Sequence, residues 1–210
     1  MKDTQLAQYD WTTISKKVLL IIIGSIISAY GIDLAIHAGF GGATLAVPWQ
    51  GMAKTFNITI GQASFIIAAM MIVFCWFYDR KQLHVGTILY QVVYSIFVDV
   101  FTGHLWYSDS MYVNFILMLL GIIIFTFGTA LYSFANFGRG SYEALMFALV
   151  DKNQWKIKHV RMALDASLVV IGVMLGGTFG LCTVFTILMS GNLIQFFLGK
   201  FRRLESSATA

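Results

Sequence analysis

Four ionisable residues lie within or beside apolar stretches of this sequence and could carry chemistry: Asp33, His37, Asp99 and Glu143. Asp33 and His37 are four residues apart, so on a helix their side chains share one face and can touch. A carboxylate beside a histidine, which titrates near neutral pH, could bind a cation or relay a proton. The alternative is structural: Asp33 packs at a helix end and His37 reaches water.

Asp99 and Glu143 allow two interpretations each. Asp99 is expected at the same membrane face as Asp33, where two carboxylates could bound the entrance for a cation or simply be solvated. Glu143 follows Gly140-Ser141, and a helix that begins there places Glu143 near its positive end, where a carboxylate is favourable. Capping and a place in a solute pathway explain Glu143 equally well.

The chain lacks the signatures of common enzymes and cofactor sites. It has no Walker-type Gly-x-x-x-x-Gly-Lys-Ser/Thr, no His-Glu-x-x-His, no Cys-x-x-Cys and no Gly-x-Ser-x-Gly. Cys75 and Cys182 lie in apolar segments and indicate neither a disulfide framework nor a metal cluster. Asp165 lies four residues from Arg161, so a local ion pair is its simplest interpretation. We therefore expect no enzyme activity, no catalytic residue, no metal and no cofactor.

The elements that must position these residues are helices in a membrane. Of the 210 residues, 58% are hydrophobic and 11% are charged, whereas soluble domains carry about 25% charged residues. Runs such as Val18–Ile27 and Phe115–Phe127 contain no Lys, Arg, Asp or Glu. In hydrocarbon the backbone must satisfy its own hydrogen bonds, and these runs are apolar on every face instead of alternating as barrel strands do. An all-α membrane protein follows.

Six segments are predicted to span the membrane, since about 20 residues cross about 30 Å of hydrocarbon. The predicted spans are Lys17–Ala38, Gly61–Tyr78, Leu83–Thr102, Tyr112–Ala135, His159–Gly177 and Leu181–Phe201. Gly42–Phe56 and Gly140–Val150 are too short to span and are predicted to form re-entrant or interfacial helices. The whole chain, 1–210, is then one integral membrane domain, with cytoplasmic tails at 1–16 and 202–210.

The distribution of basic residues predicts the orientation. With the N-terminus in the cytoplasm, 13 of the 14 Lys and Arg residues lie inside and only Lys54 lies outside. Short loops follow the positive-inside rule most closely, so both termini are expected in the cytoplasm and the protein in the plasma membrane. The net charge of +4 then reflects topology and not nucleic acid binding. Five spans, one of them long and tilted, is the alternative to six.

The chain also contains an internal repeat. A shift of 97 residues aligns Gly24–Gly41 with Gly121–Gly138, and 8 of the 18 positions are identical. Each half holds three predicted spans, and an odd number inserts the second half in the opposite direction. We therefore predict two inverted-topology repeats, 17–102 and 112–201, as in many secondary transporters. The aligned Gly31 and Gly128 suit close helix crossing. A stable bundle without a pathway is the alternative.

Two short elements recur in the halves. Ala38-Gly39-Phe40-Gly41 follows the first span, and Ala135-Asn136-Phe137-Gly138 follows the fourth. Gly86-Thr87 opens the third span, and its second copy reads Gly176-Gly177, Gly180 and Cys182-Thr183. With these elements the chain resembles the YczE/YyaS/YitT-type family of bacterial integral membrane proteins over nearly its whole length.

That family carries an Ala-x-Leu-Gly-x-x-Pro-Trp-Asp-like element, and the resemblance implies a second copy of it here. Counted from Gly41, its Pro-Trp-Asp falls on Thr44-Leu45-Ala46, so the proline and the acid are expected to be missing from the first copy. In the second copy Ser141 replaces the proline and Glu143 keeps the acid. Any role of that acid in the family is thus expected only in the inner copy.

These patterns predict an ATP-independent transporter or exporter of a small molecule or ion. Asp33 and Asp99 would bound an outer vestibule, with His37 beside Asp33, and Glu143 would line the inner one. The alternative is a non-transporting accessory, regulatory or substrate-binding subunit of a larger complex. The expected partners are the lipid bilayer and an unidentified small molecule or ion, and both a homodimer and a partner membrane protein stay open.

Overall fold

The computed structural model describes residues 11–105 and 107–208, which form eight α-helices and one 3₁₀ helix and contain no strand. In chain order the elements are α1 (Trp11–Ile36), α2 (Ala46–Phe56), α3 (Ile60–Tyr78), η1 (Arg80–Gln82), α4 (Val85–Phe101), α5 (Met111–Phe134), α6 (Ser141–Asn153), α7 (Ile157–Met174) and α8 (Leu181–Ala208). Of the predicted tails, residues 1–10 and 209–210 lie outside the described residues. Residues 11–16 belong to α1 and 202–208 to α8.

An all-helical membrane protein is confirmed. Four helices, α1, α3, α5 and most of α8, are long and apolar enough to cross a membrane. α4 is apolar but has only 17 residues. α7 has 18 residues and contains the ionisable Lys158, Arg161 and Asp165, which lower its hydropathy. α2 and α6 have 11 and 13 residues, too few to span about 30 Å of hydrocarbon.

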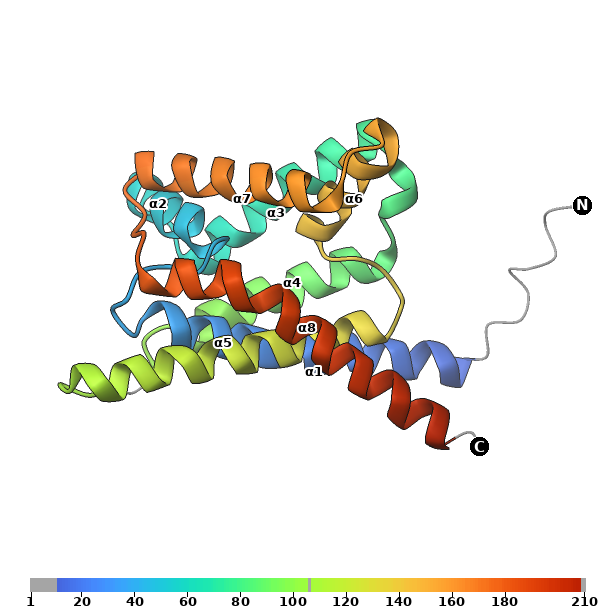
Figure 1. Ribbon diagram of the computed structural model, residues 1–210, viewed down its shortest axis with the longest axis horizontal. Helices are drawn as coiled ribbons and strands as arrows, with labels where there is room; N and C mark the ends of the chain where they lie inside the picture. The colour runs from blue at the N-terminus through green and yellow to red at the C-terminus, as the bar shows by residue number, and fades with distance from the viewer. Residues whose placement is uncertain (1–10, 106, 209–210) are drawn as a thin grey trace, which may run out of the picture.

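The two short helices lie at opposite ends of the molecule, as Figure 1 shows. Each ends at a residue with positive φ, Asn57 after α2 and Gln154 after α6, and this left-handed conformation stops a helix. The Trp11 end of α1 and the Ala208 end of α8 lie together at the α6 end (Figure 1). Chain segments near both termini thus share one side of the molecule.

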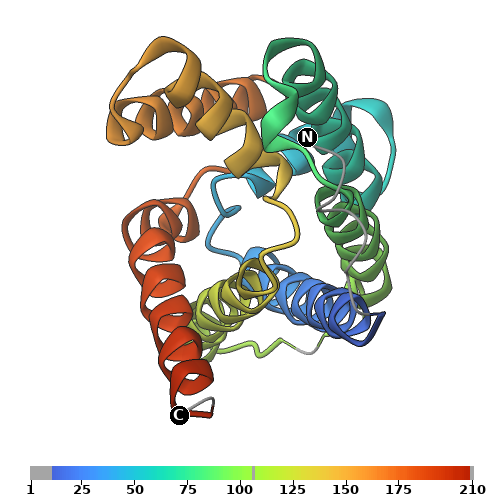
Figure 2. The same ribbon diagram turned by 90° about the vertical axis from the view of Figure 1, so that its right-hand side faces the viewer.

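Helices α1 and α5 pack closely in antiparallel directions, side by side in both Figures 1 and 2. A Cβ added to Gly31 would lie 2.7 Å from the Gly121 carbonyl oxygen, and one added to Gly128 would lie 2.7 Å from the Gly24 carbonyl oxygen. Both distances are below van der Waals contact. Only glycine therefore allows these two backbones to approach so closely.

Each short helix packs on a helix from the other half of the chain: α2 on α7, and α6 on α3. The Lys54 amine of α2 donates to the Gly176 carbonyl at 2.9 Å, just beyond the end of α7. The Lys152 amine of α6 donates to the Tyr78 carbonyl at 3.3 Å, at the end of α3. In both places a lysine satisfies a carbonyl that the helix itself leaves without a partner.

The two Ala-x-Phe-Gly elements make a matching exchange. The Phe137 carbonyl accepts from the Gly86 amide at 3.2 Å, and the Phe40 carbonyl accepts from the Cys182 amide at 3.0 Å. In the second contact, the Thr183 hydroxyl also donates to the Gly42 carbonyl at 2.5 Å. Each element thus holds the first turn of the last helix of the opposite half.

The prediction that the first copy lacks its proline is wrong. Pro48 and Trp49 lie in the first turn of α2, where a proline needs no backbone N–H partner. They come four residues after Thr44-Leu45 because α2 begins further from Gly41 than α6 does from Gly138, and because Pro48 lies inside α2 whereas Ser141 is the first residue of α6. The acid alone is replaced, by Gln50, whose Oε1 accepts from the Thr178 hydroxyl at 2.6 Å.

Candidate functional site

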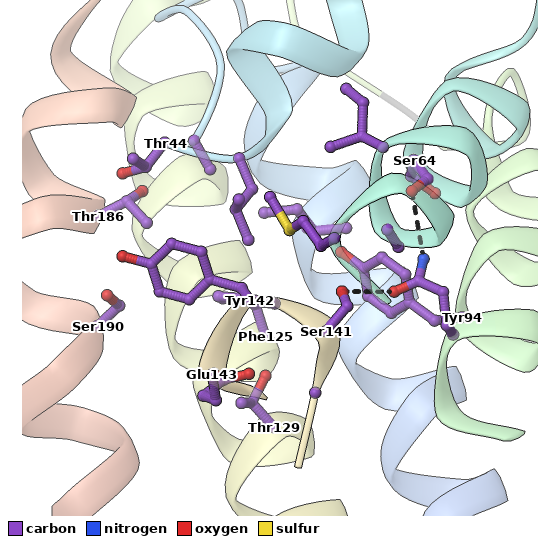
Figure 3. A pocket seen from close by; sticks show the side chains of 18 of the residues that line it. Thr44, Ser64, Tyr94, Phe125, Thr129, Ser141, Tyr142, Glu143, Thr186 and Ser190 are labelled. Atoms are coloured by element: carbon purple, nitrogen blue, oxygen red, sulfur yellow. Dashed lines mark hydrogen bonds between the residues drawn. The ribbon is translucent and has the colours of Figure 1, made fainter. Parts of the chain in front are cut away.

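A central cavity of about 90 Å³ lies where the two halves meet. Every one of the eight α-helices contributes at least one residue to its wall. In Figure 3, Tyr142 and Glu143 of α6, Thr186 and Ser190 of α8, and Ser141 at the start of α6 surround it. The wall mixes apolar side chains with hydroxyls and three charged groups, Glu143, Arg161 and Asp165.

Glu143 enters the cavity because α6 begins two residues before it. Its Oε2 accepts from the Tyr132 hydroxyl at 3.4 Å, and the same hydroxyl accepts from the Gly140 amide at 3.2 Å. The predicted position of Glu143 in the first turn of a short helix is therefore confirmed, and the residue also lines the cavity. Capping and solute contact are compatible at this residue.

Asp165 and Arg161 face the cavity from α7. The Tyr142 hydroxyl donates to Asp165 Oδ1 at 2.6 Å, and Arg161 Nε lies 3.9 Å from Asp165 Oδ2. Arg161 also donates to the Ser190 hydroxyl at 3.4 Å. The ion pair predicted from the four-residue spacing is present, but it lies on the wall of the cavity.

Aromatic rings form a continuous row along the cavity. Tyr132 and Tyr90 stack with ring centroids 3.9 Å apart, Tyr90 and Tyr94 with centroids 5.4 Å apart, and Trp49 meets Tyr94 edge-on at 6.0 Å. All four line the cavity, so the row leads from the Glu143 end to short helix α2. The Tyr94 hydroxyl is buried and has no hydrogen-bond partner among the described residues.

A polar network joins α6 to α3 and α4. The Gln91 amide donates to the Ser95 hydroxyl at 2.9 Å, and the Ser64 and Ser95 hydroxyls are 2.9 Å apart. The Ser141 hydroxyl donates to Gln91 Oε1 at 3.5 Å (Figure 3). In this way the beginning of α6 is attached to the pair of helices that forms the opposite wall.

Asp33 and His37 meet as predicted, but outside the cavity. Asp33 is fully buried, and its Oδ1 lies 3.0 Å from His37 Nδ1 and accepts from the Thr102 hydroxyl at 2.9 Å. The Asp33 hydrogen bond raises the pKa of His37, which follows the last residue of α1. Burial, and next the Asp33 charge, raise the pKa of Tyr107 in the adjacent loop, so its hydroxyl stays protonated.

Both carboxylate oxygens of Asp99 make their contacts at the beginning of α3. Its Oδ1 accepts from the Gly61 amide at 2.7 Å, and its Oδ2 accepts from the Thr59 hydroxyl at 2.6 Å. Thr59 is the N-cap of α3, so Asp99 of α4 caps a neighbouring helix. This geometry favours the structural interpretation of Asp99.

The remaining predicted residues lie at helix contacts. Gly31 and Gly128 lie at the α1–α5 crossing. Gly41 and Gly138 both have positive φ, at 88° and 149°, and lie against Gly180 and Thr87 respectively. Gly86 and Thr183 make the exchanged loop contacts described above.

Together, the helices and the cavity define a multi-pass helical membrane protein with a polar centre. The sequence profile of the family of unknown function DUF6198 matches residues 15–199. The chain belongs to this family.

Three relatives cover most of the chain. An uncharacterized protein of Haemophilus influenzae is 33% identical over 92% of this chain and 88% of its own length. The uncharacterized membrane protein YczE of Bacillus subtilis is 28% identical over 89% of this chain and 87% of its own. The uncharacterized protein YyaS of the same species is 22% identical over 84% and 89% respectively. The resemblance to YczE and YyaS is thus confirmed. No solved structure matches the chain.

Proposed function

We propose that this protein is an ATP-independent transporter of a small solute, which binds in the central cavity while the cavity opens alternately to the two membrane faces. The observation that carries this proposal is the presence of Glu143, Arg161 and Asp165 on the cavity wall inside an apolar bundle. Ionisable groups are costly at such places, and a passive bundle would be more stable with apolar residues there.

The proposal includes six membrane-spanning helices in two inverted repeats: α1, α3, α5 and α8, together with α4 and α7. Its support is the order of elements, since α1 to α4 and α5 to α8 each place a short helix second. Each half of the chain also makes the same two contacts with the other half. Lys54 and Lys152 each donate to a carbonyl at the end of a helix in the opposite half, and the Phe40 and Phe137 carbonyls each accept from the first turn of one. Inverted repeats that meet at a central cavity are a common basis for alternating access.

The orientation is part of the proposal. The charge distribution favours α6 at the cytoplasmic face of the plasma membrane and α2 at the outer face. Thr44, in the loop before α2, then lies toward the outer side of the cavity, and Ser190 of α8 lies toward the inner side.

Two-sided cysteine labelling tests the proposal without knowledge of the solute. In a background with Cys75→Ala and Cys182→Ala, we expect a membrane-impermeant maleimide to label Thr44→Cys from outside and Ser190→Cys from inside. Both residues are buried here, at 6% exposure, so labelling requires opening. Ala148→Cys, buried between α6 and α3, is the control and should stay unlabelled. A lack of reaction at both Thr44→Cys and Ser190→Cys would contradict alternating access.

A further inference from the structure

We infer that the central cavity takes a small monovalent organic cation, an amine or a quaternary ammonium ion. This inference rests on the proposed function and names its substrate class. It depends on the charges of the cavity wall, one unpartnered hydroxyl, the aromatic row and the size of the cavity.

The charges on the wall do not balance. Glu143 and Asp165 are two carboxylates, whereas Arg161 is the single Lys or Arg among the lining residues of the described chain. Arg161 is about one-third exposed, at 37%, and its Nε lies 3.9 Å from Asp165. The nearby Arg139 is engaged elsewhere, because it donates to Gln82 at 2.6 Å and lies over the Phe147 ring. An arriving cation would compensate the excess negative charge.

Hydrogen-bonding capacity is also left over inside the cavity. Tyr94 lines it and is 3% exposed, yet its hydroxyl has no partner within the described residues. A buried hydroxyl without a partner costs stability, so an amine whose N–H donates to its oxygen gains affinity. A quaternary ammonium ion has no N–H and would be held by the carboxylates and the aromatic rings alone. The rings of Trp49 and Tyr90 contact the Tyr94 ring, and Tyr132 stacks on Tyr90. Aromatic rings attract ammonium groups.

Size and ligand set decide the kind of cation. The cavity of about 90 Å³ is smaller than the ~150 Å³ cavity that holds benzene, so it takes a ligand with fewer non-hydrogen atoms than benzene. Apolar side chains such as Ile67, Met71 and Ile187 form part of the wall and suit methyl groups. Among the described residues, no group of three His, Cys, Asp or Glu side chains could hold a metal ion. An alkylammonium ion satisfies these conditions better than a divalent metal.

Thermal unfolding of the purified full chain in detergent tests the inference. We expect methylammonium or tetramethylammonium chloride to raise the melting temperature saturably, relative to sodium chloride at equal ionic strength. Neutral tert-butanol and sodium acetate should not. Glu143→Gln should weaken the binding of the effective cation by at least about tenfold, because it removes a charged partner. Asp109→Asn, in an exposed loop, is the matched control and should leave the affinity unchanged.

Three results would overturn the cation assignment: no cation effect, equal stabilisation by tert-butanol or acetate, or an unchanged affinity in Glu143→Gln. If Glu143→Gln does not fold, the test uses Ser190→Cys, which keeps both carboxylates. Tetramethylammonium should then protect this cysteine from maleimide, and a lack of protection would contradict the assignment. If Thr44→Cys and Ser190→Cys are labelled from opposite sides but no cation raises the melting temperature, the transport proposal is supported and the cation assignment is rejected. If a cation raises the melting temperature but neither cysteine is labelled, the cation site is supported and the transport proposal is rejected.

Discussion

The Tyr142 hydroxyl donates a hydrogen bond of 2.6 Å to Asp165 Oδ1. This bond joins the first turn of short helix α6 to the middle of α7, at the wall of the cavity. Asp165 is mostly buried, with a side chain 13% exposed, so its charge depends on the few donors within reach. The attachment of α6 to the bundle and the electrostatics of the cavity are therefore coupled through one hydroxyl.

Removal of that hydroxyl should destabilise the protein. In Tyr142→Phe the ring remains, but Asp165 loses its short hydrogen bond, and bonds to charged groups contribute about 1.5–3 kcal/mol. We expect a lower free energy of unfolding by about that amount in a denaturant titration. Tyr112→Phe, on an 85% exposed ring, is the control and should change little. An unaltered stability of Tyr142→Phe would show that the bond is not maintained in the membrane protein.

The cap at the start of α3 gives a second prediction. Asp99→Asn keeps the shape of the side chain but weakens its contacts with Thr59 and the Gly61 amide. Helix caps contribute about 0.5–2 kcal/mol, so we expect a loss of stability in that range with ligand affinity retained. A variant with native stability that no longer binds any solute would instead place Asp99 in the pathway.

The Asp33–His37 pair predicts a pH dependence of stability. The pKa of His37 is raised above 6.5 in the folded protein, so its contribution is fully present below about pH 6.5 and is lost as pH rises through the raised value. We expect the melting temperature to fall across that interval. In His37→Gln the fall should be smaller, because no charge is lost. Equal pH profiles of the wild type and His37→Gln would exclude the pair as the cause.

The α1–α5 crossing should not tolerate larger side chains. Gly31→Leu combined with Gly128→Leu places new atoms against backbone of the partner helix, so the folded yield should drop sharply. Gly199→Leu is a suitable control, since a Cβ there meets nothing within 4 Å. A wild-type elution profile for the double variant in size-exclusion chromatography would mean that the two helices separate in the membrane.

Helix positions were largely predictable because a helix that crosses the hydrocarbon needs about 20 apolar residues, and the apolar runs of the sequence have that length. All six predicted spans coincide with helices, although α1 starts at Trp11 and α8 continues past Arg202. Hydropathy marks where lipid ends, whereas helical hydrogen bonding continues into water. Hydropathy does not mark α7 as a span, because its Arg161 and Asp165 line the cavity and lower the mean hydropathy of the helix.

The candidate site was only partly predictable. Glu143 was found because its place in a short helix is a local feature, and the Arg161–Asp165 pair follows from spacing alone. Their common position around a cavity depends on contacts between distant segments, which spacing does not encode. Tyr90, Tyr94 and Tyr132 were missed because tyrosine in a membrane protein is most often interfacial. The capping role of Asp99 depends on the distant residue Thr59.

Distances between spin labels at the two ends of the bundle test alternating access most directly. Phe56 at the end of α2 and Met111 at the beginning of α5 are one exposed pair, and Trp155 after α6 and Leu204 near the end of α8 are the other. These two groups of helix ends lie at opposite ends of the molecule in Figure 1. One pair at a time is changed to cysteine and labelled with nitroxides. Pulsed electron–electron double resonance in nanodiscs should then give two distance populations for each pair. We expect the fraction open at one end to equal the fraction closed at the other. A single narrow distance at both ends, unchanged with methylammonium or tetramethylammonium, would contradict alternating access.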